Sequence, residues 1–103
     1  MLKFGLKKEQ IDILVDIFAK YSSISKVIIF GSRVKNTYKE YSDIDLCLYG
    51  KIEKSELMEI NNQIIESNLL YKTDLIVFED VTNEKLKQSI DKEGRVFWVK
   101  VEI

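Results

Sequence analysis

The sequence lacks histidine altogether and contains a single cysteine, Cys47, among its 103 residues. Zinc sites in proteins are normally built from histidine and cysteine side chains, so these counts argue against a zinc centre. One cysteine also cannot form an intramolecular disulfide. Any metal ion would therefore be bound by oxygen atoms, which are the ligands that Mg²⁺, Mn²⁺ and Ca²⁺ prefer.

An excess of positive charge is also missing, because 16 basic residues face 17 acidic ones and the formal net charge is -1. No overall positive field attracts nucleic acid, so we expect no direct nucleic-acid binding and a local site for any anionic ligand. No apolar stretch approaches the roughly 18 residues of a membrane span, and no segment resembles a secretory signal peptide. We expect a cytoplasmic protein that does not bind membranes.

The chain length and the 46% hydrophobic content predict one folded domain over residues 1–103. Hydrophobic periodicity predicts an alternation of helices and strands, with Thr82 as the N-cap of the last helix. The predicted elements are a helix at 8–21, strands at 26–30 and 44–49, a helix at 53–69, a strand at 74–78, a helix at 83–92, and a fourth strand or packed tail at 95–101. This order indicates an α/β (α+β) fold with a small mixed sheet of about three to four strands flanked by helices.

The first predicted helix has more apolar surface than a small domain usually buries. One stripe follows helical spacing, and Ile13, Ile17 and Tyr21 form a second stripe. The second stripe fits either an interface with another protein or a wide core face, and the sequence leaves both interpretations open. The helix at 53–69 has its own predicted core residues, namely Leu57, Ile60, Ile64, Ile65 and Leu69.

A glycine–serine pair, Gly31-Ser32, ends the first predicted strand. Glycine lets the backbone approach a ligand closely. We expect residues 33 to 36 to form a helical turn whose free N–H groups face an anion such as a triphosphate. Taken alone this pair is weak evidence, because glycine and serine after a strand usually form an ordinary turn.

A second feature is a group of acidic residues around the start of the second predicted strand. Asp43 and Asp45 are two residues apart, so a strand would project both carboxylates to the same side. Their mutual repulsion would be relieved by a divalent cation between them, although an isolated pair of this kind is more often a solvated strand edge. If the strand that begins at Asp74 lies beside them, three carboxylates can hold two metal ions about 3.5–4 Å apart for in-line phosphoryl displacement.

The combination of these features resembles a known family. The pattern resembles that of the nucleotidyltransferase superfamily of DNA polymerase β type. It consists of Gly31-Ser32, ten intervening residues, Asp43-x-Asp45, and a later acidic residue, Asp74, that begins a strand. The strings Phe-Gly-Ser-Arg and Ser-Asp-Ile-Asp-Leu resemble its small MNT-type members, the minimal nucleotidyltransferases. Where such members often carry Ala-Arg-Gly, this chain has Val-Lys-Asn at 34–36, and Asn36 tolerates the left-handed backbone that glycine would adopt there.

The resemblance implies transfer of a nucleoside monophosphate, AMP from ATP, to a hydroxyl acceptor with release of pyrophosphate. It implies two Mg²⁺ ions, with Mn²⁺ as an alternative, and ATP as donor. It also implies two groups of site residues: the catalytic, metal-binding Asp43, Asp45 and Asp74, and the phosphate-binding Gly31, Ser32 and Arg33.

The resemblance further implies a protein partner. Small members of the family act as antitoxins that add AMP to a tyrosine of a HEPN-domain toxin, so we expect such a toxin as partner. Two alternatives remain open: a non-catalytic antitoxin that neutralises its partner by contact alone, and a nucleotidyltransferase that modifies the hydroxyl of a small molecule. The sequence also leaves open whether the chain forms a homo-oligomer.

Overall fold

A four-stranded mixed β-sheet forms the centre of the protein in the computed structural model, which describes residues 2–101. Its strand order is β3-β2-β1-β4; β1 pairs antiparallel with β2 and with β4, whereas β2 and β3 are parallel. The predicted mixed sheet is therefore confirmed. In chain order the elements are α1 (Lys8–Phe18), β1 (Lys26–Phe30), the 3₁₀ turn η1 (Gly31–Arg33), β2 (Ile44–Tyr49), α2 (Lys54–Glu66), β3 (Thr73–Val77), the 3₁₀ turn η2 (Phe78–Asp80), α3 (Glu84–Glu93) and β4 (Arg95–Val99).

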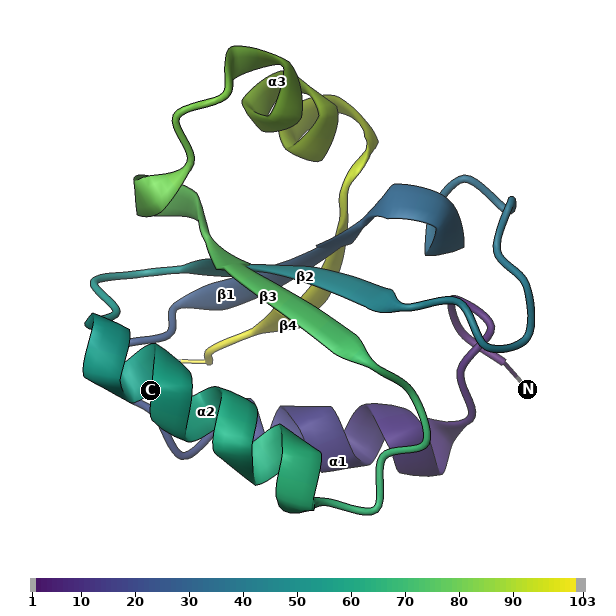
Figure 1. Ribbon diagram of the computed structural model, residues 1–103, viewed down its shortest axis with the longest axis horizontal. Helices are drawn as coiled ribbons and strands as arrows, with labels where there is room; N and C mark the ends of the chain where they lie inside the picture. Colours follow the sequence, from purple (N-terminus) through teal and green to yellow (C-terminus); the bar gives the residue numbers. More distant parts are fainter. Residues whose placement is uncertain (1, 102–103) are drawn as a thin grey trace.

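Helices cover both faces of this sheet. Helices α1 and α2 lie side by side across one face, and α3 lies over the other (Figure 1). Along β2, Ile44, Leu46 and Leu48 face α1 and α2 in the main core, whereas Cys47 and Tyr49 face a smaller apolar cluster beneath α3. This alternation follows from the two-residue period of a strand.

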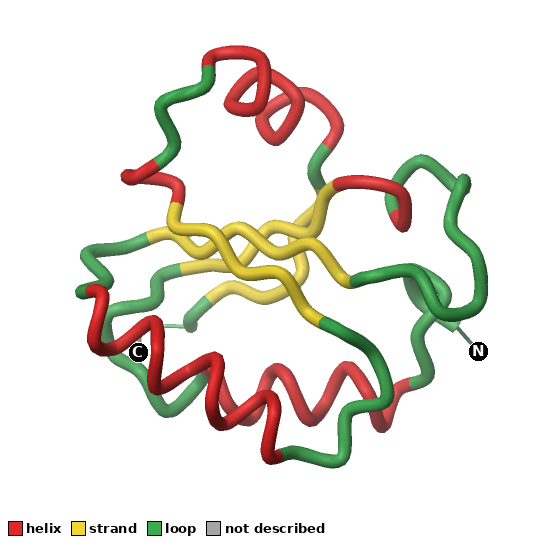
Figure 2. Tube along the Cα trace, in the orientation of Figure 1, coloured by secondary structure: helices red, strands yellow, loops and turns green. Residues whose placement is uncertain are grey.

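The parallel pairing of β2 with β3 requires a crossover connection, which α2 supplies. Both strands consequently begin at the same edge of the sheet, where loops lead into them (Figure 2). The short link between β1 and β2 instead reverses the chain direction, as its length predicted. The amino ends of β2 and β3 and the carboxyl end of β1 therefore meet at one edge.

The second apolar stripe of α1 belongs to the core. Ile17 and the following Tyr21 are only 6% and 8% exposed, and Ile13 packs partly buried against the same cluster. The amide of Gln63 on α2 donates a hydrogen bond to the Tyr21 hydroxyl. Helix α2 thus covers the stripe, and the wide core face is the interpretation that the structure supports.

Two local predictions were wrong. The N-cap of α3 is Asn83 and not Thr82, because the Asn83 Oδ1 atom accepts a 3.1 Å hydrogen bond from the Leu86 amide. Ile65 was expected to face inward but is 78% exposed, since it lies about 100° around the helix from the buried Ile64. Among residues 2–101, no helix combines the length and apolar character needed to cross a membrane.

Candidate active site

The turn after β1 begins at Gly31, whose φ of 81° lies in the left-handed region that glycine adopts readily. The Val34 amide donates to the Gly31 carbonyl and the Lys35 amide donates to the Ser32 carbonyl, which closes the 3₁₀ turn. The turn starts two residues earlier than the predicted 33–36, because Gly31 reverses the chain as soon as the strand ends. The leading N–H groups of such a turn have no acceptor within it.

Gly31 lies directly against the carboxylate of Asp45. Phe30 and Asp45 are paired residues of β1 and β2, so the turn that follows Phe30 passes over the Asp45 side chain. A Cβ atom on Gly31 would collide with Asp45 Oδ2. Position 31 therefore requires glycine for two reasons, namely the backbone angle and the lack of space for a Cβ atom. The turn and the Asp45 carboxylate lie in direct contact and form one site.

Asp45 and Asp74 are partners in the register of the parallel pair β2–β3. The two side chains accordingly emerge on the same face of the sheet, the face that α3 covers in part. Asp43 precedes β2 by one residue and is exposed, as is Asp74, whereas Asp45 is half-buried. The condition under which all three acids share one site, namely that the third strand lies beside the second, is met.

The electrostatics of the three acids reflect this grouping. The pKa of Asp45 is raised above its ordinary value, first by burial of its carboxyl and then by the negative charges of Asp74 and Asp43. Like charges so close together disfavour the ionised form of the half-buried member. A cation bound among them would remove that penalty.

The acids do not form a complete metal cage. Across residues 2–101, no group of three or more His, Cys, Asp or Glu side chains is arranged to hold a metal ion. Mg²⁺ commonly binds one or two carboxylates and completes its octahedral shell with water and substrate phosphates. A half-buried carboxylate flanked by two exposed ones, beside a turn with free N–H groups, fits that kind of site.

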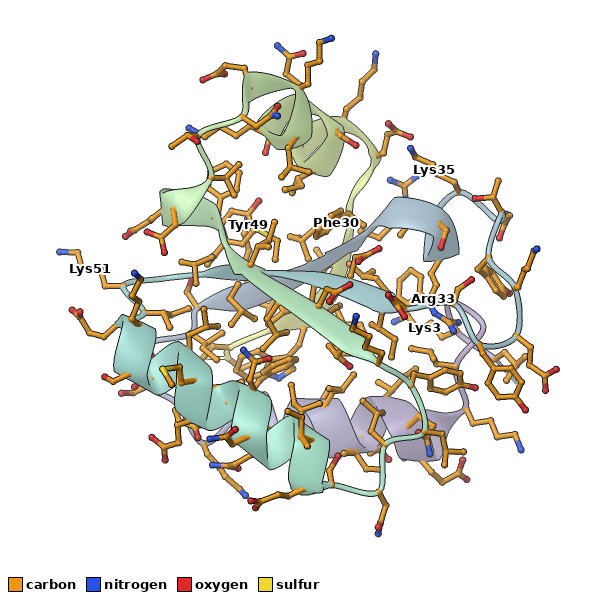
Figure 3. All side chains as sticks on the ribbon, in the orientation of Figure 1. Lys3, Phe30, Arg33, Lys35, Tyr49 and Lys51 are labelled. Carbon is orange, nitrogen blue, oxygen red and sulfur yellow. The ribbon has the colours of Figure 1, made fainter. Side chains whose placement is uncertain are left out.

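Arg33 lies behind the turn rather than in the open. Its side chain is only 2% exposed, and its guanidinium donates hydrogen bonds to the carbonyl oxygens of Ser42 and Phe4. In Figure 3 its side chain lies next to the amino-terminal segment that carries Lys3. The structure therefore brings Gly31 and Ser32 to the acids but points the third residue predicted to bind phosphate towards backbone carbonyls.

Two aromatic residues near the site were not found from the sequence. The rings of Tyr71 and Tyr38 lie 4.9 Å and 5.2 Å from the Arg33 guanidinium carbon. Neither tyrosine belongs to the glycine–serine or acidic motif, so motif spacing did not indicate them. Asn36 has a φ of 57°, in the left-handed region that asparagine tolerates.

The sequence matches the family model described as Polymerase beta, Nucleotidyltransferase over residues 12–102. Two curated relatives from Methanocaldococcus jannaschii, both named as candidate protein adenylyltransferases, are 36% identical over 73 residues, which is 68% of this chain and 72% of each relative. A third from the same organism, named in the same way, is 27% identical over 79 residues, covering 73% of this chain and 79% of the relative.

Solved structures share the fold. A chain in a crystal structure of a toxin–antitoxin with AMP-PNP superimposes with a TM-score of 0.71 at 18% identity, covering 87% of this chain and 73% of that one. A chain in the complex of a tri-AMPylated Shewanella oneidensis HEPN toxin with its MNT antitoxin gives a TM-score of 0.66 at 18% identity, covering 90% and 72%. These likenesses describe the architecture alone.

Proposed function

The chain belongs to the polymerase beta nucleotidyltransferase family, and from this premise we propose that it transfers AMP from ATP to a tyrosine hydroxyl of a HEPN-domain toxin. Such a transfer would make the protein an antitoxin. The family assignment supports an enzyme that uses a nucleotide substrate. The identities of the nucleotide, of the acceptor and of the metal ions go beyond the family assignment and are what we propose.

One observation carries the proposal: Gly31 touches the Asp45 carboxylate, and Asp45 is paired with Asp74. The turn and the carboxylates can hold the same metal-bound triphosphate only if they lie side by side, because that ligand must reach both. The fold provides this proximity at the edge where β1 ends and β2 and β3 begin.

The residues divide the reaction between them. The N–H groups of Gly31 and Ser32, with the Ser32 hydroxyl, hold the β- and γ-phosphates and orient the α-phosphorus. Asp43 and Asp45 bind Mg²⁺, and Asp74 completes the binding site for a second ion. When bound, the ions neutralise charge that develops on the α-phosphate and on the leaving pyrophosphate.

Proton transfer is assigned to Asp74. In this scheme the acceptor oxygen forms a bond to the α-phosphorus, and the bond between that phosphorus and the oxygen bridging to the β-phosphate breaks. Pyrophosphate leaves with the bond electrons, and the acceptor proton passes to the Asp74 carboxylate, which is exposed and free to return it to water. The product is a phosphodiester between AMP and the acceptor.

The choice of a protein acceptor draws on the relatives. Those in Methanocaldococcus jannaschii are named as candidate protein adenylyltransferases, and one similar structure contains an AMPylated HEPN toxin together with an MNT antitoxin. These names describe those proteins. For this chain they support a protein hydroxyl over a small molecule as the acceptor.

Co-expression with a HEPN-domain toxin tests the proposal. We expect the wild type to restore growth and to leave AMP on a partner tyrosine, detected by peptide mass spectrometry. The double variant Asp43→Ala/Asp45→Ala should do neither, whereas the control Asp16→Ala/Asp80→Ala, which removes two exposed acids elsewhere, should do both. Restored growth by Asp43→Ala/Asp45→Ala, with no AMP on the partner in any sample, would instead identify a non-catalytic antitoxin.

A further inference from the structure

Arg33 is a buried cation without a carboxylate partner. Within residues 2–101, the ion pairs join Lys8 to Asp12 and Lys35 to Glu93, and neither includes Arg33. Burying a guanidinium away from water is costly unless hydrogen-bond acceptors or an opposite charge replace the lost hydration. The contacts that replace water at Arg33 therefore indicate what this side chain does.

One set of contacts holds the segment that enters β2. Arg33 Nη2 and Nε donate to the Ser42 carbonyl oxygen at 2.7 Å and 3.2 Å. Ser42 immediately precedes Asp43, so the guanidinium fixes the peptide group from which Asp43 emerges. Two donors of a rigid planar group define a direction as well as a distance, which a single ammonium does not.

A second set of contacts reaches the segment that enters β3. The guanidinium carbon lies 4.9 Å from the ring centre of Tyr71, three residues ahead of Asp74. The Ile44 amide donates a 2.9 Å hydrogen bond to the Lys72 carbonyl, which ties the two segments together beside this stack. Arg33 thus contacts both segments that lead into the acid-bearing strands.

The amino-terminal turn closes the other side of the guanidinium. Phe4 and Gly5 have φ angles of 57° and 74°, as in a tight reverse turn, and the Phe4 carbonyl accepts a 2.9 Å hydrogen bond from Arg33 Nη1. A Cβ atom on Gly5 would lie 2.9 Å from Nη1 and 2.5 Å from the ring of Tyr38. The amino-terminal turn and Tyr38 therefore both contact the guanidinium.

We propose that Arg33 is a positioning residue, which sets the placement of Asp43 and Asp74 around Asp45 and does not itself bind the nucleotide. The inference rests on the proposed function, because it concerns the metal-binding acids of that site. Groups that orient metal ligands from behind typically alter metal affinity by about 10- to 100-fold when they are removed.

Mn²⁺ binding tests this role without relying on catalysis. Arg33→Lys keeps the charge but loses the planar fork, and Arg33→Met loses both, while Arg95→Met removes an exposed arginine whose guanidinium also donates to backbone carbonyls. Mn²⁺ would be titrated by calorimetry in the presence of a non-hydrolysable ATP analogue, and binding of the analogue would be measured separately without metal. We expect both Arg33 variants to weaken Mn²⁺ binding by about 10-fold or more, with unchanged metal-free analogue binding and with Arg95→Met equal to the wild type.

Loss of metal-free analogue binding in Arg33→Met, with recovery in Arg33→Lys, would identify a phosphate ligand and overturn the proposal. Wild-type Mn²⁺ affinity in both variants would overturn it equally. Absence of Mn²⁺ binding by the wild type would contradict the proposed function itself, which is a separate result.

Hydrogen exchange covers the case in which the Arg33 variants fold poorly. In Tyr71→Leu, which removes the stacked ring, we expect faster amide exchange at Ile44 and weaker Mn²⁺ binding, with α2 amides unchanged. Tyr71→Phe retains the ring and should match the wild type. General loosening that raises exchange in α2 as much as at Ile44, or unchanged exchange at Ile44 in Tyr71→Leu, would contradict a positioning role.

Discussion

Asp45 and Asp74, 29 positions apart in the sequence, are direct partners across the parallel strands β2 and β3. The crossover through α2 creates this pairing, which no local preference of either strand would produce. Burial of Asp45, and then the charges of Asp74 and Asp43 beside it, raise the pKa of Asp45. Bringing these carboxylates together therefore lowers the free energy of unfolding of the metal-free protein.

Asp45→Asn should stabilise the metal-free fold at pH 7. The pKa of Asp45 is raised in the folded protein, by burial first and then by Asp74 and Asp43, so its ionised form disfavours folding at every pH above that raised value. The penalty disappears as the pH falls through the folded pKa towards the ordinary value of 3.8. Thermal unfolding should show a higher midpoint for Asp45→Asn at pH 7 and no difference from the wild type near pH 3.

Divalent cations provide the complementary measurement for this variant. Mg²⁺ with an ATP analogue should raise the wild-type midpoint by more than that of Asp45→Asn, which loses the central carboxylate of the metal site. Asp16→Asn, at an exposed position on α1, serves as the control and should behave as the wild type in both experiments. A lower midpoint for Asp45→Asn at pH 7 would contradict the electrostatic account.

Gly31→Ala should lower both stability and nucleotide transfer. The φ of 81° costs a residue with a Cβ atom about 1–2 kcal/mol, and the new methyl group would also collide with Asp45 Oδ2. A double-mutant cycle by urea denaturation separates the two effects: Gly31→Ala should be less destabilising in an Asp45→Ala background. Equal costs in both backgrounds would show that the contact does not matter.

Local sequence patterns predicted most of the backbone correctly. The strands at 26–30 and 44–49 have the predicted bounds, because runs of β-branched and leucine residues that end at glycine mark them clearly. The placement of Asp74 beside Asp45 followed only from a conditional strand order, since parallel pairing depends on the whole fold.

Arg33 shows where prediction from motifs ended. Its hydrogen-bond acceptors are the backbone carbonyls of Phe4 and Ser42, and any residue type supplies a carbonyl. These contacts therefore cannot be predicted from the pattern of residue types in the sequence. The same limit applies to the second stripe of α1, because core and interface positions on a helix have the same apolar composition.

Stability should decline at alkaline pH because of Cys47. Burial, with a smaller contribution from the charge of Asp91, raises the pKa of the thiol from 9.0 to about 12. Between these values the unfolded chain releases the thiol proton and the folded protein retains it, so the free energy of unfolding falls as the pH rises from 9 to 12. Denaturant titrations across that range should show a shallower decline for Cys47→Ala than for the wild type, and identical slopes would contradict the shift.

Asp74→Asn should abolish AMP transfer while part of the metal binding survives. The amide cannot accept the acceptor proton, and loss of a general base lowers rates by about 100- to 10,000-fold. Asp43 and Asp45 remain, so Mn²⁺ with an ATP analogue should still bind, but with lower affinity than to the wild type. Initial rates of labelled transfer measure the effect, with Asp80→Asn as the matched exposed control. Full activity in Asp74→Asn would remove this residue from the site.

The position of the label in ATP tests the central claim most directly. The HEPN-domain partner would be incubated with the protein, Mg²⁺ and ATP labelled on either the α- or the γ-phosphate. We predict that the partner acquires label only from the α-position, that γ-label leaves as pyrophosphate, and that Asp43→Ala/Asp45→Ala yields neither product. Label transferred from the γ-position, or α-label transferred undiminished by Asp43→Ala/Asp45→Ala, would contradict nucleotidyl transfer at these acids.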